Sequence, residues 1–149
     1  MKGNKGFSLL ELLVVMLLLG LSSLLVLPAM DRRLGRLEIR KSALRLAAVA
    51  RDLRTKAVFQ GSLQYLVLTP SDNSYQAGSG NRVHFPSEVR IAAVEGGVPA
   101  GSGMVQFNFY PNGRILGGAI EISGPDGAGS YVTRFDPLSG RVQVLRGNR

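Results

Sequence analysis

Residues 7–27 read FSLLELLVVMLLLGLSSLLVL, an apolar run whose only charged side chain is Glu11. As an α-helix, this run would be about 31 Å long, close to the thickness of a bilayer's hydrocarbon core. A short basic segment, MKGNKG at residues 1–6, precedes it. The run therefore predicts a helix that is retained in a membrane and that begins close to the N-terminus.

A cleaved secretory signal is the alternative interpretation, because a basic start and an apolar run are also its marks. Such a signal needs only about 7–15 apolar residues, with small residues before the cut. The run is longer here, and Leu27-Pro28-Ala29 begins with a large side chain. We therefore favour the retained helix.

Glu11 is the unusual residue of the run. A charged side chain deep in a bilayer costs at least about 2.5–3.5 kcal/mol on insertion scales, so it is usually paired and functional. Near the start of the run, Glu11 could also lie at the membrane interface and reach water. Its spacing alone leaves both interpretations open.

The segment GFSLLE at residues 6–11 follows a short basic leader and opens a long apolar helix. This arrangement resembles the N-terminal signature of type IV pilins and type II secretion pseudopilins. In these families a prepilin peptidase cuts after the glycine and methylates the new N-terminal residue. The resemblance implies that residues 1–6 are a leader, that the cut falls between Gly6 and Phe7, and that Phe7 is N-methylated.

Two further residues take their expected roles from the same resemblance. Glu11 would meet the free amine of a neighbouring subunit during filament assembly. That role is physically reasonable, since two charges in an apolar filament core are tolerated only as a pair. Pro28 matches the proline that bends the first helix in many of these proteins, so residues 7–28 are expected to form the transmembrane and filament-core helix.

The flanking cations and the resemblance disagree about orientation. Two lysines precede the run and six cations follow it within residues 32–45. The positive-inside rule would then place the C-terminal side in the cytoplasm. The resemblance implies the reverse, a bacterial inner-membrane protein with a single span, a cytoplasmic N-terminus and a periplasmic C-terminal domain. We follow the resemblance, because the processing signature is more specific than a charge count.

Residues 29–60 are predicted to continue the helix in amphipathic form. One face is marked by spacings of three and four residues. It carries Ile39, Ala43, Leu46, Ala50, Leu53 and Ala57. Small alanines suit close packing on a sheet, whereas the stretch is short for a coiled coil. Gly61 is the expected stop, which makes the helix from residue 7 to 60 about 80 Å long.

Residues 61–149 are predicted to form a separate β-rich module, because glycines and period-two runs concentrate there. Strands are expected at 64–69, 82–85, 88–94, 104–109, 119–123, 131–136 and 141–146. Residues 70–81 and 96–103 are expected to be mobile loops. The fold class is therefore α+β, with a long N-terminal helix, its first half transmembrane, packed on a small antiparallel β-sandwich.

Three fragments of this module resemble the GspH/FimT group of minor pilin-like proteins. They are FNFYPNG at 107–113, GGAI at 117–120 and DPLSGRV at 136–142. Their order behind the pilin-like N-terminus makes the resemblance cover most of the chain, although residues 66–104 carry little of it. The resemblance implies a pilin-like fold, with a long helix packed on a β-sandwich.

No residue or motif in the sequence indicates a catalytic, metal or cofactor site. The absence of cysteine excludes a disulfide scaffold, a zinc–cysteine site and a cysteine enzyme. His84 is the only histidine and has no spaced ligand partner, so we interpret it as a surface or core residue. The glycine–serine segments at 78–80 and 101–103 lack the lysine and the strand-to-helix context of a phosphate loop. We expect a peptidase substrate rather than an enzyme.

The resemblance offers two functions. The first is a minor pseudopilin of a type II secretion system, at or near the tip of the periplasmic pseudopilus that drives export of folded proteins across the outer membrane. Its expected partners are other pseudopilins (minor tip subunits and the major subunit), the prepilin peptidase, the inner-membrane platform, and secreted cargo or the secretin. The second is a FimT-like minor type IV pilin that binds DNA for natural transformation through Arg141, Arg146 and Arg149. A signal-anchored periplasmic protein unrelated to filaments is a third interpretation.

The distribution of charge favours the secretion role. The net charge is +8, but residues 31–56 carry nine cations against three acids, whereas residues 61–149 carry seven against six. Non-specific nucleic-acid affinity comes mainly from neutralising phosphates, so it needs a basic exposed module. The DNA-binding members also carry a Gly-Arg-x-Arg element, and this chain has Gly140-Arg141-Val142-Gln143 there.

Overall fold

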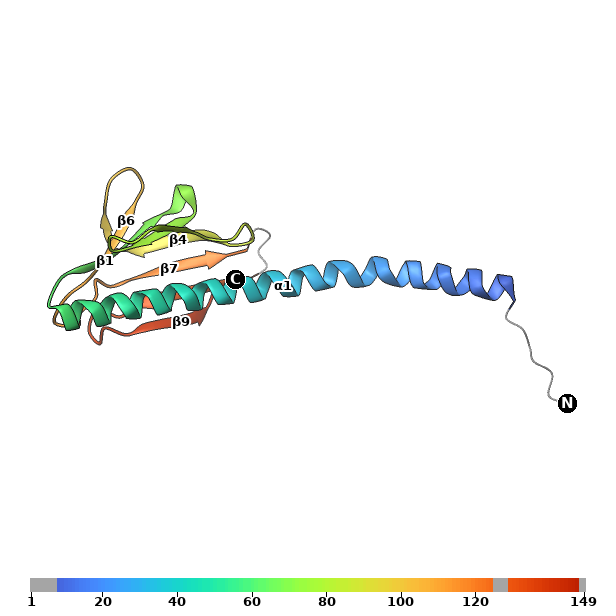
Figure 1. The fold of residues 1–149 in the computed structure, drawn as a ribbon, viewed down its shortest axis with the longest axis horizontal. Helices are drawn as coiled ribbons and strands as arrows, with labels where there is room; N and C mark the ends of the chain where they lie inside the picture. The colour runs from blue at the N-terminus through green and yellow to red at the C-terminus, as the bar shows by residue number, and fades with distance from the viewer. Residues whose placement is uncertain (1–7, 125–128, 148–149) are drawn as a thin grey trace. The chain divides into compact units, whose positions relative to one another are not determined.

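One long helix and a β-rich module make up the chain (Figure 1). The computed structural model describes residues 8–124 and 129–147, and within them the side chains of all but residues 23–34. The chain divides into two compact units, Met1–Leu34 and Gly35–Arg149. Helix α1 (Leu9–Gln60) contributes residues to both units.

Helix α1 ends at the predicted residue. Gln60 is its last residue, and Gly61 follows with φ of 60°. This left-handed conformation is open to glycine without strain and is typical of the residue after a helix. The chain then turns into the first strand after a connection of three residues, 61–63.

The predicted apolar face of α1 is the face that packs in the second unit. All six of its members are at most 3% exposed: Ile39, Ala43, Leu46, Ala50, Leu53 and Ala57. Ala47 beside them is also fully buried. Because alanines alternate with larger residues, the helix backbone can approach the sheets closely while the larger side chains fill the space between.

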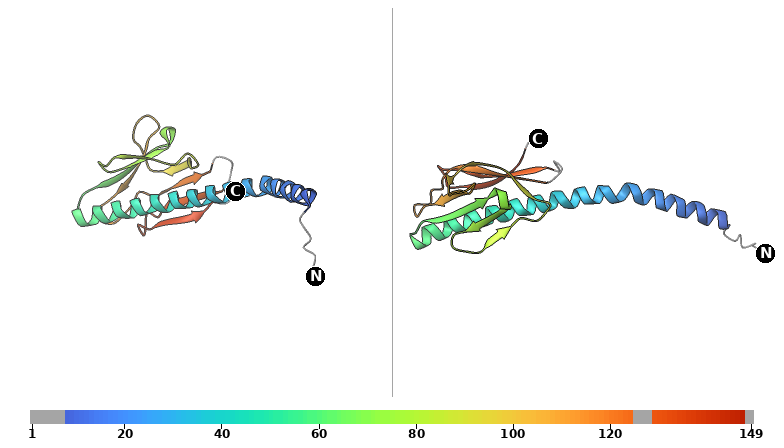
Figure 2. Two further views of the ribbon diagram at one scale, coloured as in Figure 1. Left: turned by 45° about the vertical axis from the view of Figure 1, so that its right-hand side comes forward. Right: turned by 90° about the horizontal axis from the view of Figure 1, so that it is seen from above.

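Two antiparallel sheets complete the module (Figure 2). The first has the order β3-β2-β1-β6-β5, formed by β1 (Gln64–Thr69), β2 (Ser74–Ala77), β3 (Arg82–His84), β5 (Val98–Pro99) and β6 (Val105–Phe109). The second has the order β4-β7-β8-β9, formed by β4 (Arg90–Gly96), β7 (Gly118–Ser123), β8 (Ser130–Phe135) and β9 (Val142–Arg146). Only Gly97 separates β4 from β5, so the chain passes there from one sheet to the other.

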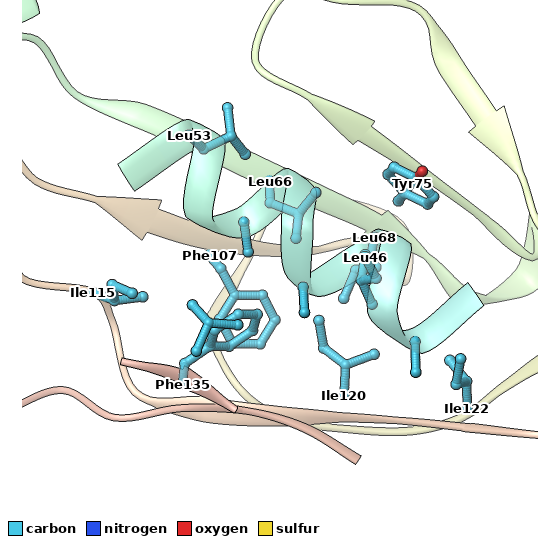
Figure 3. Close-up of a cluster of buried hydrophobic side chains, with 14 of the residues drawn as sticks. Leu46, Leu53, Leu66, Leu68, Tyr75, Phe107, Ile115, Ile120, Ile122 and Phe135 are labelled. Atoms are coloured by element: carbon cyan, nitrogen blue, oxygen red, sulfur yellow. The ribbon is translucent and has the colours of Figure 1, made fainter. Parts of the chain in front are cut away.

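A single hydrophobic core joins α1 to both sheets (Figure 3). Leu66 of β1 and Phe107 of β6 enter it from the first sheet, and Ile120 of β7 and Phe135 of β8 from the second. The rings of Phe107 and Phe135 lie 4.8 Å apart and tie the two sheets together. The α+β class, with a long N-terminal helix on antiparallel sheets, is confirmed.

The prediction that residues 70–81 and 96–103 are loops is wrong in part. Strand β2 lies within the first stretch and the two-residue β5 within the second, so the described residues form nine strands rather than seven. A short helix, η1 (Pro70–Asp72), and Asn73 with φ of 47° reverse the chain between β1 and β2. Pairing with β1 and β3 on either side then makes β2 a strand, although SYQA is a weak strand sequence by itself.

Candidate functional site

The N-terminus of α1 is capped by Ser8. Its hydroxyl oxygen accepts a hydrogen bond from the backbone N–H of Leu10 at 3.2 Å, and its carbonyl accepts one from Glu11 at 3.0 Å. The helix therefore begins one residue after Ser8. Gly6 and Phe7, the predicted processing site, lie outside the described residues.

Glu11 is placed in the first turn of α1, three residues after the capping serine. Ser-x-x-Glu is the pattern of a capping box, and a carboxylate there also interacts favourably with the positive end of the helix dipole. The Glu11 side chain is exposed in the single chain. Sequence reasoning missed this local role, and the signal that could have revealed it is the spacing of Ser8 and Glu11.

An exposed apolar surface begins beside Glu11, at Leu9, and continues along the first unit. Its leucine, valine and methionine side chains from Leu9 to Leu21 are 44–86% exposed. A continuous apolar surface of this kind marks a site of contact with a partner or with lipid. Among the residues that the structure describes, no helix is both long enough and apolar enough to cross a membrane. Pro28 falls in the part of α1 whose side chains are not described, and its bend stays a prediction.

Near the C-terminal end of α1, Arg54 contacts two turns of the module, at Gly113 and Gly140. Both turns belong to segments that resemble the GspH/FimT group. Arg54 donates a hydrogen bond from Nε to the carbonyl oxygen of Gly113 at 2.9 Å. Gly140 lies against both, because a β-carbon on it would contact the Gly113 carbonyl oxygen and come within 2.8 Å of Arg54 Nε. With φ of 65°, Gly140 also adopts a conformation that other residues rarely take. Gly140 is therefore needed for packing against the helix.

Asp136 holds the turn that presents Arg141. Its carboxylate accepts a hydrogen bond from the Ser139 hydroxyl at 2.8 Å and from the backbone N–H of Leu138 at 2.9 Å. Its carbonyl accepts a bond from the N–H of Gly140. The bonds to the carboxylate, the Ser139 hydroxyl first, lower the pKa of Asp136.

We expect Asp136→Ala to destabilise the module at neutral pH and to have little effect in strong acid. A carboxyl whose pKa is lowered by folding contributes stability above its unfolded pKa and loses that contribution as the pH falls through the folded value. The melting temperatures of the wild type and of Asp136→Ala, measured between about pH 2 and pH 7, should therefore converge at the acid end. Asp136→Asn keeps an acceptor for the backbone N–H groups of Leu138 and Ser139 and should lose less at neutral pH. A loss for Asp136→Ala that stays the same from about pH 2 to pH 7 would contradict the role of the charge.

Arg141, one of the three predicted DNA-contact candidates, lies at a pocket. It lies beside Arg51 and Arg54 of α1 around a pocket of about 340 Å³, and Arg146 is not among the residues that line it. Arg149 lies outside the described residues. Arg51 and Arg54 were missed by the sequence interpretation, although their spacing of three places them on one helix face.

No metal site is found in the described part of the chain, in which no three metal-binding side chains come together. His84 lies exposed on β3, with its Nδ1 3.9 Å from a carboxylate oxygen of Asp72. It is thus a surface histidine, one of the two interpretations left open by the sequence.

Comparison with known sequences gives one match at the N-terminus and one over most of the chain. Residues 1–27 match the family described as the prokaryotic N-terminal methylation motif. The chain is also 27% identical, over 121 residues, to type II secretion system protein H of Xanthomonas campestris pv. campestris. That alignment covers 80% of this chain and 71% of the relative.

Comparison with solved structures gives the same fold. The minor pseudopilin EpsH from the type 2 secretion system of Vibrio cholerae superposes with a TM-score of 0.57 at 14% identity, covering 73% of this chain and 97% of EpsH. The type IV minor pilin FimU of Pseudomonas aeruginosa gives 0.55 at 18% identity, covering 74% and 90%. The N-terminal motif and the protein H relative support the predicted resemblance to the GspH/FimT group of minor pilin-like proteins, and the two solved structures share the fold of this chain.

Proposed function

We propose that the chain is a minor pseudopilin of a type II secretion system, assembled through its N-terminal helix at or near the tip of the periplasmic pseudopilus that drives export. The observation that carries this proposal is the exposed apolar surface of the first unit, directly behind a prepilin processing signature. A helix with that surface needs cover from lipid before assembly and from neighbouring helices after it. The protein H relative supports secretion as the system concerned.

The proposed topology assigns a role to each part of the chain. Residues 1–6 are a cytoplasmic leader, residues 7–28 the inner-membrane and filament-core helix, residues 29–60 its amphipathic continuation, and residues 61–149 the periplasmic module. The proposed partners are other pseudopilins, the prepilin peptidase, the inner-membrane platform, and cargo or the secretin. In the filament, Glu11 pairs with the amine of a neighbour's Phe7.

Processing by a prepilin peptidase tests the first step of this proposal. On coexpression with the peptidase, intact-mass measurement should show loss of residues 1–6 and gain of one methyl group on Phe7. Gly6→Val should block the cut, whereas Gly3→Val, the same change elsewhere in the leader, should not. An unprocessed wild-type chain would exclude the filament assignment.

Deletion of the gene in its own organism tests which system the protein serves. The proposal expects secreted proteins to accumulate in the periplasm, with export restored by the wild-type gene and not by the Gly6→Val gene. A FimT-like minor pilin is the second candidate, favoured by the gathering of Arg141, Arg51 and Arg54. Unchanged export together with lost DNA uptake would decide for that candidate.

A further inference from the structure

A cationic pocket lies between α1 and the turn that leads into β9. It has a volume of about 340 Å³ and is lined by Arg51, Arg54, Thr55, Gly140, Arg141, Val142 and Gln143. Its helical wall comes from residues three and four apart, which share one face of α1. We call this pocket the arginine groove. No carboxylate is among its lining residues.

The three guanidinium groups of the arginine groove have no ion-pair partner within the described residues. Arg51 donates from Nη2 to the carbonyl oxygen of Val142 at 2.8 Å, and Arg54 donates from Nε to that of Gly113. Both acceptors are neutral, so neither compensates the charge. The ion pairs of lysine and arginine in the described residues are Lys41–Glu38, Lys56–Asp52 and Arg82–Asp72, all outside the groove lining.

The same bonds hold the groove in shape before any ligand arrives. Arg51 and Arg54 are each fixed by one carbonyl, and each guanidinium retains further N–H donors. The backbone of Arg141 is fixed by the turn, because its N–H donates to the Ser139 hydroxyl and its carbonyl accepts from Asp136. Ordering the Arg51 and Arg54 side chains on binding therefore costs less than ordering mobile ones.

A carboxylate fits this arrangement better than a nucleic-acid backbone. Guanidinium groups bind a planar carboxylate through paired N–H bonds, which suits one or two acidic side chains in a small pocket. A duplex needs several phosphate contacts along a basic track. Such a track is interrupted here, because Lys56, one turn further along the helix, is paired with Asp52 at 2.8 Å.

We propose that the arginine groove binds an acidic segment of a neighbouring pseudopilin, with the guanidinium groups of Arg51, Arg54 and Arg141 holding its carboxylates. This inference rests on the proposed function, since the neighbour exists only if the chain assembles with other subunits. It assigns Arg141 to protein–protein contact and makes the helix arginines part of the same surface.

Calorimetric titration of the full chain in a neutral detergent tests the binding chemistry. The probes are end-capped hexaglutamate, hexaglutamine of the same length, and a short DNA duplex, all at about 50 mM salt so that screening is modest. Hexaglutamate should bind with one site, and hexaglutamine should not bind. Arg141→Gln should weaken hexaglutamate binding roughly tenfold or more, because it removes charge-assisted hydrogen bonds.

Arg90→Gln on β4 is the matched control, since it removes the same charge from an exposed position outside the groove. An equal weakening by Arg90→Gln and Arg141→Gln would show diffuse charge attraction and overturn the inference. Duplex DNA that binds more tightly than hexaglutamate, through the same arginines, would also overturn it. Failure of hexaglutamate to bind a chain that the peptidase still processes would remove the groove proposal and leave the pseudopilin proposal intact.

Discussion

Glu11→Gln is expected to abolish filament assembly while leaving the helix and its processing intact. In the assembled filament the Glu11 carboxylate is proposed to face the Phe7 amine of a neighbour in apolar surroundings. Removing one partner of a buried charge pair costs about 3–5 kcal/mol, because the other charge is left uncompensated. Assembly should therefore weaken by a factor of roughly 10²–10⁴.

Glutamine is the informative replacement because the structure gives Glu11 a local role as well. Glutamine serves at the third helical position of a capping box as glutamate does, so the Ser8 cap remains. If Glu11 matters only for starting the helix, Glu11→Gln should behave like the wild type. If the charge pairs with a neighbour, Glu11→Gln should fail like Glu11→Ala.

Cross-linking in the organism that encodes the chain measures this difference. With the chromosomal copy replaced by each variant, formaldehyde adducts of the protein with other subunits should disappear for Glu11→Gln, and export should fall with them. Glu38→Gln is the matched control on the same helix, since it only breaks an exposed ion pair with Lys41, worth at most about 1 kcal/mol. Wild-type adduct levels in Glu11→Gln would contradict the proposed pair.

The helix and most of the strands could be predicted because their signals are local. The buried face of α1 follows from the spacing of its apolar residues alone, and the end of the helix follows from Gly61. Strand β1 has the predicted bounds, since an apolar run there is followed directly by Pro70. Strand β2 could not be predicted in this way, because Ser74–Ala77 becomes a strand through pairing with β1 and β3.

The arginine groove could not be predicted, because its walls are far apart in the chain. Arg51 contacts the carbonyl of Val142, 91 residues away, and Arg54 contacts Gly113, 59 residues away. Strand β9 lies at the edge of the second sheet, and the bond from Arg51 to Val142 places it beside α1. The sequence interpretation named Arg141, Arg146 and Arg149 as C-terminal candidates, and nothing in the sequence relates Arg141 to the two arginines of α1 that line the pocket with it.

Phe107→Ala is expected to destabilise the module by about 3–5 kcal/mol, the usual cost of truncating a buried phenylalanine. Phe107 is fully buried, and its ring joins the first sheet to Phe135 of the second. Since small domains are stable by only about 5–15 kcal/mol, much of the module's stability should be lost. Urea unfolding monitored by tyrosine fluorescence measures the loss in the free energy of unfolding. The signal reports on the module, because the chain has no tryptophan and all four tyrosines lie in residues 61–149.

Phe59→Ala makes the same truncation at a side chain that is 86% exposed near the end of α1. It should change the free energy of unfolding by no more than about 0.5 kcal/mol, since a surface substitution leaves no cavity. The difference between the two variants therefore isolates the contribution of the core that joins the sheets to the helix. Similar losses for both variants would mean that Phe107 does not hold the two sheets together, because burial would then make no difference to the cost of removing the ring.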